Sequence, residues 1–65
     1  MRLEATVMQL IEDGGELSVA IHGWAETDPA GISPRPLGTI NIPANEHNRS
    51  ALYIGRELII DVKPV

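Results

Sequence analysis

The sequence predicts an all-β protein, either a small antiparallel β-barrel or a curled sheet of four to five strands. Three observations predict it. Apolar and polar residues alternate in several short segments, an Asp-Gly-Gly turn joins the first two segments, and prolines and glycines separate the others. Because a chain of 65 residues is too short for two domains, we expect residues 1–65 to form a single small β-barrel domain.

The first two expected strands form a hairpin. In residues 3–11 one parity is mostly apolar and is assigned to the interior, whereas the other parity, with Met8 and Leu10, is assigned to solvent. Helical spacing fits the same residues, so a helix is the alternative. The next residues favour the hairpin, because Asp-Gly-Gly accepts the positive φ of a tight turn and leads into a second alternating segment, residues 17–24.

The segment 25–36, AETDPAGISPRP, contains three prolines and has no hydrophobic period. Its residues 28–31 fit a type I turn, with Asp first, Pro second and Gly fourth. Pro34 and Pro36 donate no backbone hydrogen bond and hold the residues before them in extended geometry. We therefore expect a long, stiff loop, with Ile32 as the apolar residue that anchors it to the body.

The second half of the chain continues the alternation. A third strand is expected over residues 37–42, followed by a polar turn at 44–49. Residues 50–55 fit either a helical turn or a short strand at 51–54 that ends in a tight turn at Gly55, and the strand is favoured. The clearest strand covers residues 56–63, where alternate residues are Leu58, Ile60 and Val62.

This order of elements suits an SH3-like architecture better than an OB-like one. A long loop follows the first hairpin, and a tight turn precedes the last strand. The likeness is one of architecture, since no motif in the chain identifies a family.

Composition limits how such a domain is stabilised. The chain has no cysteine, so disulfides and zinc–thiolate sites are excluded, and Trp24 and Tyr53 are its only aromatic residues. The core must therefore be aliphatic. A core in this size range rarely contributes more than about 3–5 kcal/mol without a disulfide, a metal or a neighbouring subunit, so we expect self-association.

The balance of charge is acidic. Nine acidic residues oppose five basic ones, for a formal net charge of −4, and most of the acids lie in residues 1–30. A net acidic surface opposes non-specific binding to nucleic acid and anionic lipid. No apolar run reaches the length of a signal peptide or a membrane span. We expect a cytoplasmic protein with no membrane association.

Catalysis and bound cofactors are not expected. His22 and His47 lie in different segments, and neither has the ligand spacing of a metal site. No serine has the context of a catalytic nucleophile, and Gly14-Gly15 precedes a strand instead of the helix that a phosphate-binding loop requires. The sequence thus predicts a non-enzymatic protein with no metal and no cofactor.

The proline-rich loop is the expected site for a protein partner, which the sequence does not identify. Trp24 lies where the loop begins, and its amphipathic ring suits a binding surface. The other role of Trp24, which the aliphatic core favours over contact with a ligand, is to seal an open end of the barrel. The predicted partner-binding residues are Trp24, Asp28, Ile32, Pro34, Arg35, Pro36 and Tyr53.

A second surface is expected to join copies of the chain. Met8, Leu10 and Ile59 are apolar residues on the parity assigned to solvent, and they would form one patch if the first and last strands are neighbours. Such a patch predicts a homo-oligomer, most simply a twofold dimer.

The main functional hypothesis is an assembly or interaction module that self-associates and presents residues 25–36 to another protein. The alternative is a small nucleic-acid-binding or regulatory barrel that uses Arg35, Arg49 and Arg56, which the acidic balance and the scarcity of aromatic residues disfavour. A third possibility is a small subunit that contributes residues to a shared active site.

Overall fold

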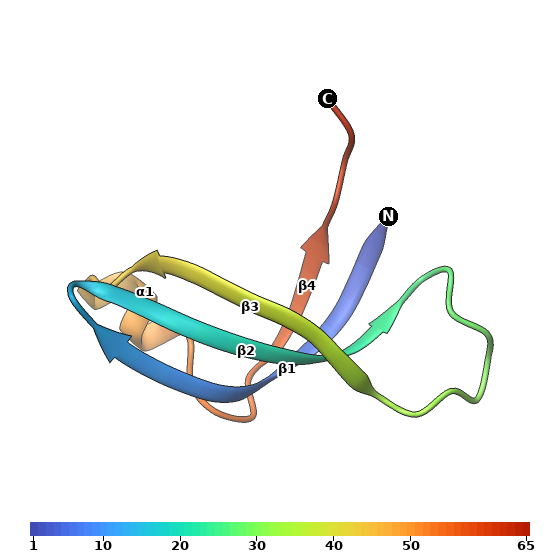
Figure 1. The fold of residues 1–65 in the computed structure, drawn as a ribbon, viewed down its shortest axis with the longest axis horizontal. Helices are drawn as coiled ribbons and strands as arrows, with labels where there is room; N and C mark the ends of the chain where they lie inside the picture. Colours follow the sequence, from blue (N-terminus) through green and yellow to red (C-terminus); the bar gives the residue numbers. More distant parts are fainter.

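The alternating segments form one antiparallel sheet with a single short helix, and the computed structural model describes all residues 1–65 (Figure 1). The strands are β1 (Arg2–Asp13), β2 (Glu16–Ala25), β3 (Arg35–Pro43) and β4 (Glu57–Asp61), and the helix α1 (Glu46–Ala51) lies between β3 and β4 in the chain. Their order across the sheet is β3-β2-β1-β4. The predicted all-β class is confirmed, with four strands.

The predicted hairpin is confirmed. Gly14 and Gly15 have φ values of 59° and 79°, and positive φ at both central residues is the requirement of the tight turns that join twisted strands. The strands β1 and β2 pair from Leu3 opposite Ala25 to Asp13 opposite Glu16. The turn chemistry therefore excludes the helical alternative for the first segment.

A β-bulge at Met8 reverses the parity of β1 halfway along its length. Val7 lies opposite Ile21, but Gln9 lies opposite Ala20, so Met8 has no partner in the ladder. After the bulge Leu10 packs against the core, while Ile11 is 51% exposed. The assignment of Leu10 to solvent was wrong, because it assumed an unbroken alternation of faces.

The core lies on the concave, inner face of the sheet. Its fully buried side chains are Ala5, Val7, Leu17, Val19 and Ile21. Ile40, Ile42, Leu58 and Ile60 pack around them on the edge strands. Only five apolar side chains are fully buried, so the margin of stability is small.

Gly23 allows β1 and β2 to approach each other where the sheet curls. A Cβ atom at this position would lie 1.9 Å from the carbonyl oxygen of Glu4. Gly23 is buried and lies opposite Ala5, so both inner-face positions of this pair are small. The close approach explains why glycine occupies a strand interior, where it is otherwise unfavourable.

The helix α1 corrects two expectations, the polar turn at 44–49 and the strand at 51–54. Asn45 caps the helix, since its side-chain oxygen accepts a hydrogen bond from the backbone N–H of Asn48 at 2.8 Å. Glu46 in the first turn and Arg49 in the last turn have the charges that the helix dipole favours. Six residues of helix therefore lie where the polar turn was expected, and residues 52–54 form no strand.

The tight turn at Gly55 is confirmed. The N–H of Arg56 donates to the carbonyl of Tyr53 at 2.9 Å, and Gly55 has a φ of 92°. This turn leads directly into β4.

The sheet is not closed into a barrel. The strand β4 pairs only with residues 2–6 of β1, whereas β3 pairs with residues 16–23 of β2, so the two edge strands diverge (Figure 1). Between them lies a hollow of about 200 Å³ on the inner face. It is lined by Val19, Ile40, Ile42, Leu52, Leu58, Ile59 and Ile60. The chain has no fifth strand that pairs with both β3 and β4.

No helix in the structure has the length and apolar character that crossing a bilayer would need.

Candidate functional site

The loop between β2 and β3 is held by the carboxylate of Asp28. One oxygen of Asp28 accepts a hydrogen bond from the backbone N–H of Ala25 at 2.8 Å, and the N–H of Asp28 donates back to the carbonyl of Ala25 at 2.9 Å. The other oxygen accepts a hydrogen bond from the guanidinium of Arg35. The two ends of the loop are thereby tied together.

These bonds determine the protonation state of Asp28. The hydrogen bond from Ala25 and the nearby Arg35 guanidinium lower the pKa of the Asp28 carboxyl from its usual value of 3.8. Its side chain is only 10% exposed, whereas that of Arg35 is 47% exposed. Asp28 is therefore a charged structural centre of the loop, and Arg35 covers it.

Trp24 fastens the middle of the loop. Its indole Nε1–H donates to the carbonyl of Ile32 at 2.6 Å. The residue nevertheless remains 38% exposed. Ile32 was predicted to be the anchor, and it is half-buried. The specific bond, however, is made by its backbone carbonyl.

The reversal inside the loop is one residue later than predicted. The N–H of Ile32 approaches the carbonyl of Pro29 at 3.4 Å, and Gly31 has a φ of 85°. The turn thus covers residues 29–32 with glycine at its third position, the arrangement that a type II turn requires. Asp28 does not begin this turn because its side chain bonds backwards to Ala25.

A hollow of about 420 Å³ opens on the outer face of the sheet beside Trp24. The strand register builds it, because Glu4 of β1 lies opposite both Trp24 of β2 and Ile59 of β4. These three residues form a row across three strands. Thr6 and Glu57 form the adjacent row. The complete lining is Glu4, Ala5, Thr6, Trp24, Glu57, Leu58 and Ile59.

The charge of this hollow is negative. Glu4 and Glu57 both line it, and neither takes part in any of the three ion pairs of the chain. They lie beside the ring of Trp24 and beside Ile59, which is 61% exposed. Two carboxylates next to an open indole and an exposed aliphatic side chain complement a cationic group with apolar neighbours.

The arginines of the nucleic-acid hypothesis lie on separate elements. Arg35 pairs with Asp28 at the loop, whereas Arg49 of α1 makes a bidentate pair with Glu12 near the hairpin turn, at 2.8 and 3.0 Å. The Glu12–Arg49 hydrogen bonds lower the pKa of Glu12 and raise that of Arg49. Two of the three guanidinium groups are therefore neutralised by acids of the same chain.

The remaining arginine is close to the second aromatic residue. The guanidinium of Arg56 lies 5.5 Å from the ring centre of Tyr53 and donates to its hydroxyl at 3.1 Å. Both residues belong to the connection between α1 and β4 and not to the proline-rich loop. Pro34 and Pro36 are exposed at the end of that loop.

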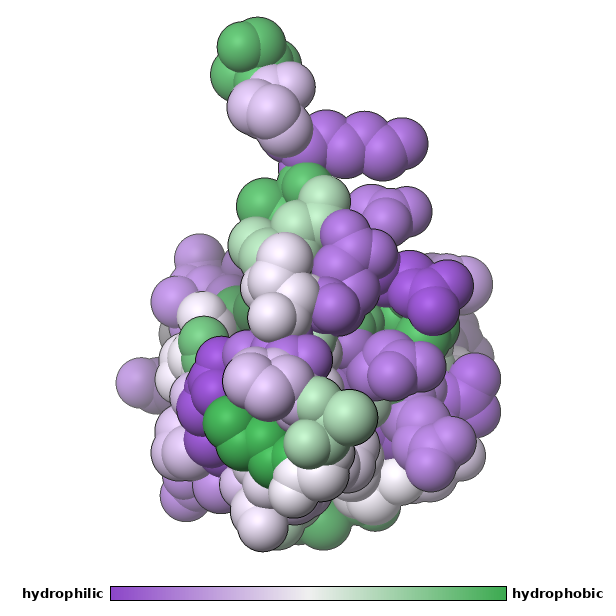
Figure 2. Space-filling model, turned by 90° about the vertical axis from the view of Figure 1, so that its right-hand side faces the viewer, coloured by the Kyte–Doolittle hydropathy of each residue, from purple (hydrophilic) through white to green (hydrophobic).

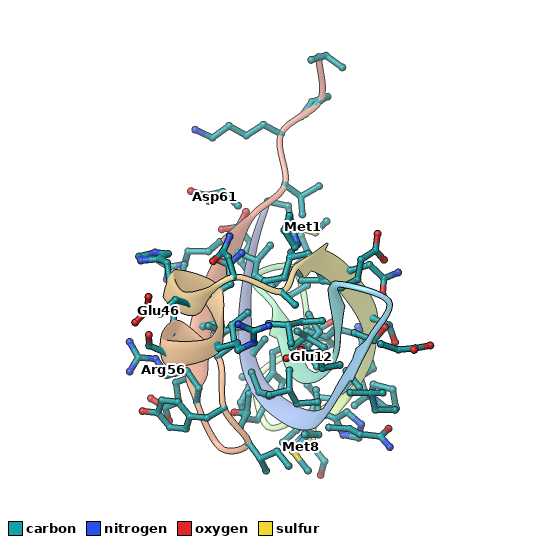
Figure 3. The ribbon with its side chains drawn as sticks, turned by 90° about the vertical axis from the view of Figure 1, so that its left-hand side faces the viewer. Met1, Met8, Glu12, Glu46, Arg56 and Asp61 are labelled. Carbon is teal, nitrogen blue, oxygen red and sulfur yellow. The ribbon has the colours of Figure 1, made fainter.

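The residues predicted to join two copies do not form one patch. Leu10 belongs to the inner face, and Met8 lies at the bulge, on the opposite side of the view from Asp61 at the end of β4 (Figure 3). Ile59 belongs to the hollow beside Trp24. Ile59 is exposed, as its parity predicted, but it belongs to a different surface from Met8.

Sequence reasoning missed Glu4 and Glu57. Their signal was present, because both fall on the outer parity of strands that were predicted. What was missing was the register, since only the pairing of β1 with both β2 and β4 puts these carboxylates beside Trp24.

Neither histidine belongs to a cluster of metal-binding side chains. No group of three or more His, Cys, Asp or Glu residues is placed to hold a metal ion. His22 is a half-buried residue of β2, and His47 is exposed on α1.

Comparison with known proteins gave no match to a family model, a curated protein or a solved structure. The functional argument therefore depends on the geometry of this chain.

Figure 2 faces the end of the molecule where the loop lies, and it shows apolar surface as separate patches among polar side chains.

Proposed function

We propose that the protein is a non-enzymatic interaction module that binds an extended protein segment carrying a basic side chain in the hollow beside Trp24. The observation that supports the proposal is the row formed by Glu4, Trp24 and Ile59 with Glu57 next to it. On this proposal the basic group lies between the carboxylates and the indole, and apolar residues of the partner contact Ile59.

The loop supports this role by holding the tryptophan in place. The Trp24 indole is bonded to Ile32, and Asp28 ties the loop ends to Ala25 and Arg35. A ring that is already ordered loses little conformational freedom on binding, which favours affinity. The proline-rich segment then supports the site through Trp24, and none of residues 25–36 lines the hollow.

Binding is proposed in preference to catalysis because the serine hydroxyls of the strands and helix have other partners, and no histidine lines the hollow to act as a base for the hydroxyl of Thr6 there. Ser18 donates to the side chain of Asn41 at 2.7 Å, and Ser50 donates to the carbonyl of Glu46 at 2.8 Å. Neither residue lines the hollow.

The test is selection of random displayed peptides on the immobilised protein, followed by affinity measurement with the enriched peptides. We expect them to share a lysine or arginine flanked by apolar residues. Trp24→Leu should weaken their binding by about tenfold or more, because an aromatic anchor is removed. Glu4→Gln should weaken it less and reduce its dependence on salt.

The matched control is Arg49→Ala, which removes a charge at the other end of the sheet and should leave peptide affinity unchanged. The proposal fails if the enriched peptides lack a basic residue, or if Trp24→Leu, shown to be folded by circular dichroism, binds them as tightly as the wild type. Binding of single-stranded DNA in place of peptides at low salt would also contradict it and would favour the nucleic-acid alternative.

A further inference from the structure

The two edge strands of the sheet differ in their ability to accept another strand. The strand β3 contains Pro36 and ends at Pro43, and its pairing with β2 is interrupted by a register shift. Prolines and irregularities of this kind protect a sheet edge. The strand β4 has no proline before Pro64 and no partner on its outer edge, so it is the open edge.

The hydrogen bonds between β1 and β4 show which backbone groups face outward. The carbonyl of Arg56 accepts a hydrogen bond from Val7 at 2.9 Å, and Val62 exchanges hydrogen bonds of 2.7 and 2.8 Å with Met1. Arg56 and Val62 therefore direct their backbone groups toward β1. Because the direction alternates along a strand, the odd-numbered residues of the segment 57–63 direct theirs to the open edge.

We infer that two copies of the chain pair antiparallel through their β4 edges, about a twofold axis at Ile60. In this register Glu57 lies opposite Lys63 of the second copy, Leu58 lies opposite Val62, and Ile59 lies opposite Asp61. The outward-facing residues, the odd-numbered ones, then pair with one another and exchange backbone hydrogen bonds. The dimer is one continuous eight-stranded sheet, twice the four strands of the chain.

Charge selects this register over its neighbours. Because side chains alternate between faces, one strand must shift by two residues relative to the other to keep the inner faces of both copies on the same side. Each such shift moves the twofold axis by one residue. If the axis passed through Ile59, Glu57 would lie opposite Asp61 of the second copy. If it passed through Asp61, the two Asp61 side chains would lie opposite each other. Like charges directly opposite are destabilising. Only the register centred on Ile60 pairs Glu57 with a lysine and avoids both repulsions.

The apolar side chains fit the same register. Leu58 and Ile60 lie on the inner face, and Val62, which continues that parity, is 43% exposed in the single chain. The dimer would join Val62 to Leu58 of the second copy and Ile60 to its own equivalent. These contacts border the apolar hollow between β3 and β4, so a second copy would cover part of that surface.

Dimerisation would also add a residue to the hollow beside Trp24. Lys63 of the second copy would lie next to Glu57, which lines that hollow. Glu4 then remains as the carboxylate that faces a partner. This interface retains Ile59 from the surface predicted from sequence, but it replaces Met8 and Leu10 with the backbone edge of β4.

Single-cysteine variants test the register directly, because the chain has no cysteine of its own. The variants are Ile59→Cys, Ile60→Cys and Asp61→Cys. Each cysteine meets its own equivalent only if the axis passes through that residue, since diagonal neighbours lie about 7–8 Å apart and cannot be bridged. During mild oxidation we expect Ile60→Cys to form a covalent dimer at least tenfold faster than the other two.

Fastest cross-linking of Ile59→Cys or Asp61→Cys would overturn the register, and equally slow cross-linking of all three would overturn the interface. The measurement involves no partner, so its outcome is independent of the proposed peptide site. Because Ile60 packs against the core, circular dichroism of each variant is needed to show that it is folded.

A charge exchange supplies the second test. The wild type should sediment at twice the chain mass of 7.0 kDa. Lys63→Glu and Glu57→Lys should each weaken the dimer about tenfold, because both symmetric pairs become repulsive, and the double variant should recover it. Sedimentation of the wild type as a 7.0 kDa species at about 100 μM, or a double variant no tighter than the single ones, would contradict the interface.

Discussion

The two ends of the sheet differ in whether their unpaired carboxylates gather beside an open apolar surface. At the hairpin end, which comprises the β1–β2 turn, the end of β3 and α1, Arg49 binds Glu12, and Asn48 of α1 donates to the carbonyl of Pro43 at 2.9 Å. At the terminal end, which comprises the start of β1, the end of β2, β4 and the proline-rich loop, Glu4 and Glu57 belong to no ion pair.

This difference separates groups that stabilise the fold from groups left for another molecule. At the hairpin end Glu12 and Arg49 already bind each other, and the acids that belong to no ion pair, Asp13, Glu16 and Glu46, line no hollow. At the terminal end an open indole, two carboxylates and an unpaired strand edge lie close together. We therefore assign both the peptide site and the dimer edge to the terminal end.

The largest effect is expected from Gly23→Ala, at the position where β1 and β2 meet. The added Cβ would collide with the backbone of Glu4 at 1.9 Å, so the strands must separate. The cost should be on the order of the total stability, about 3–5 kcal/mol for a domain of this size. Circular dichroism should show loss of the cooperative melt, whereas Thr39→Ala, an exposed change on β3, should melt like the wild type.

Survival of a cooperative transition at the wild-type temperature in Gly23→Ala would show that the close approach is not required.

The next effect distinguishes a buried residue near the hairpin end from an exposed residue at the terminal end. Leu17 is 2% exposed and Ile59 is 61% exposed, although both are aliphatic strand residues. Leu17→Ala should lower the free energy of unfolding by about 2–5 kcal/mol. Ile59→Ala should leave the stability of the single chain nearly unchanged and weaken peptide binding. Denaturant titration measures the first quantity and peptide affinity the second, and a reversed order of the two losses of stability would contradict the comparison.

A smaller effect is expected from acid. The folded-state pKa of Asp28 is lowered from 3.8, so its contribution to stability is complete above that pH and is lost as the pH falls through the folded-state value. Melting temperatures should therefore drop as the pH falls below 3.8. Asp28→Asn should reduce the drop and loosen the loop. An identical pH profile in the variant would show that Asp28 does not contribute.

The smallest effect is expected from Arg49→Ala. Its side chain and that of Glu12 are about half exposed, at 51% and 47%, and ion pairs at that exposure contribute little and are screened by salt. The melting temperature should fall slightly at low salt and match the wild type at high salt. A large loss of stability that persists at high salt would mean that α1 is held to the hairpin chiefly by this pair.

Most of the sheet could be predicted from sequence because its signals are local. Gly14-Gly15 specifies the hairpin turn, Gly55 specifies the turn before β4, and the alternation around Ile60 specifies the last strand. The helix α1 was missed although Asn45 and Glu46 form a recognisable start, because six helical residues are too few to show a period.

The candidate site was predictable only in part. Trp24 and the loop were identified from residue type and position, but the hollow also needs Glu4 and Glu57, which lie 53 positions apart in the chain. The Met8 bulge shows the same limit, since one unpaired residue changed the faces of every residue after it in β1. Register and bulges depend on long-range pairing, and alternation within one segment does not reveal them.

The most direct test of the terminal end as the binding surface is a nuclear magnetic resonance titration of the labelled protein with a selected basic peptide. The largest amide shifts should fall on Glu4, Glu57 and Ile59, together with the indole N–H of Trp24, while residues 12–16 and α1 remain unchanged. Shifts concentrated on α1 and the hairpin turn, with the Trp24 indole unaffected, would contradict the assignment.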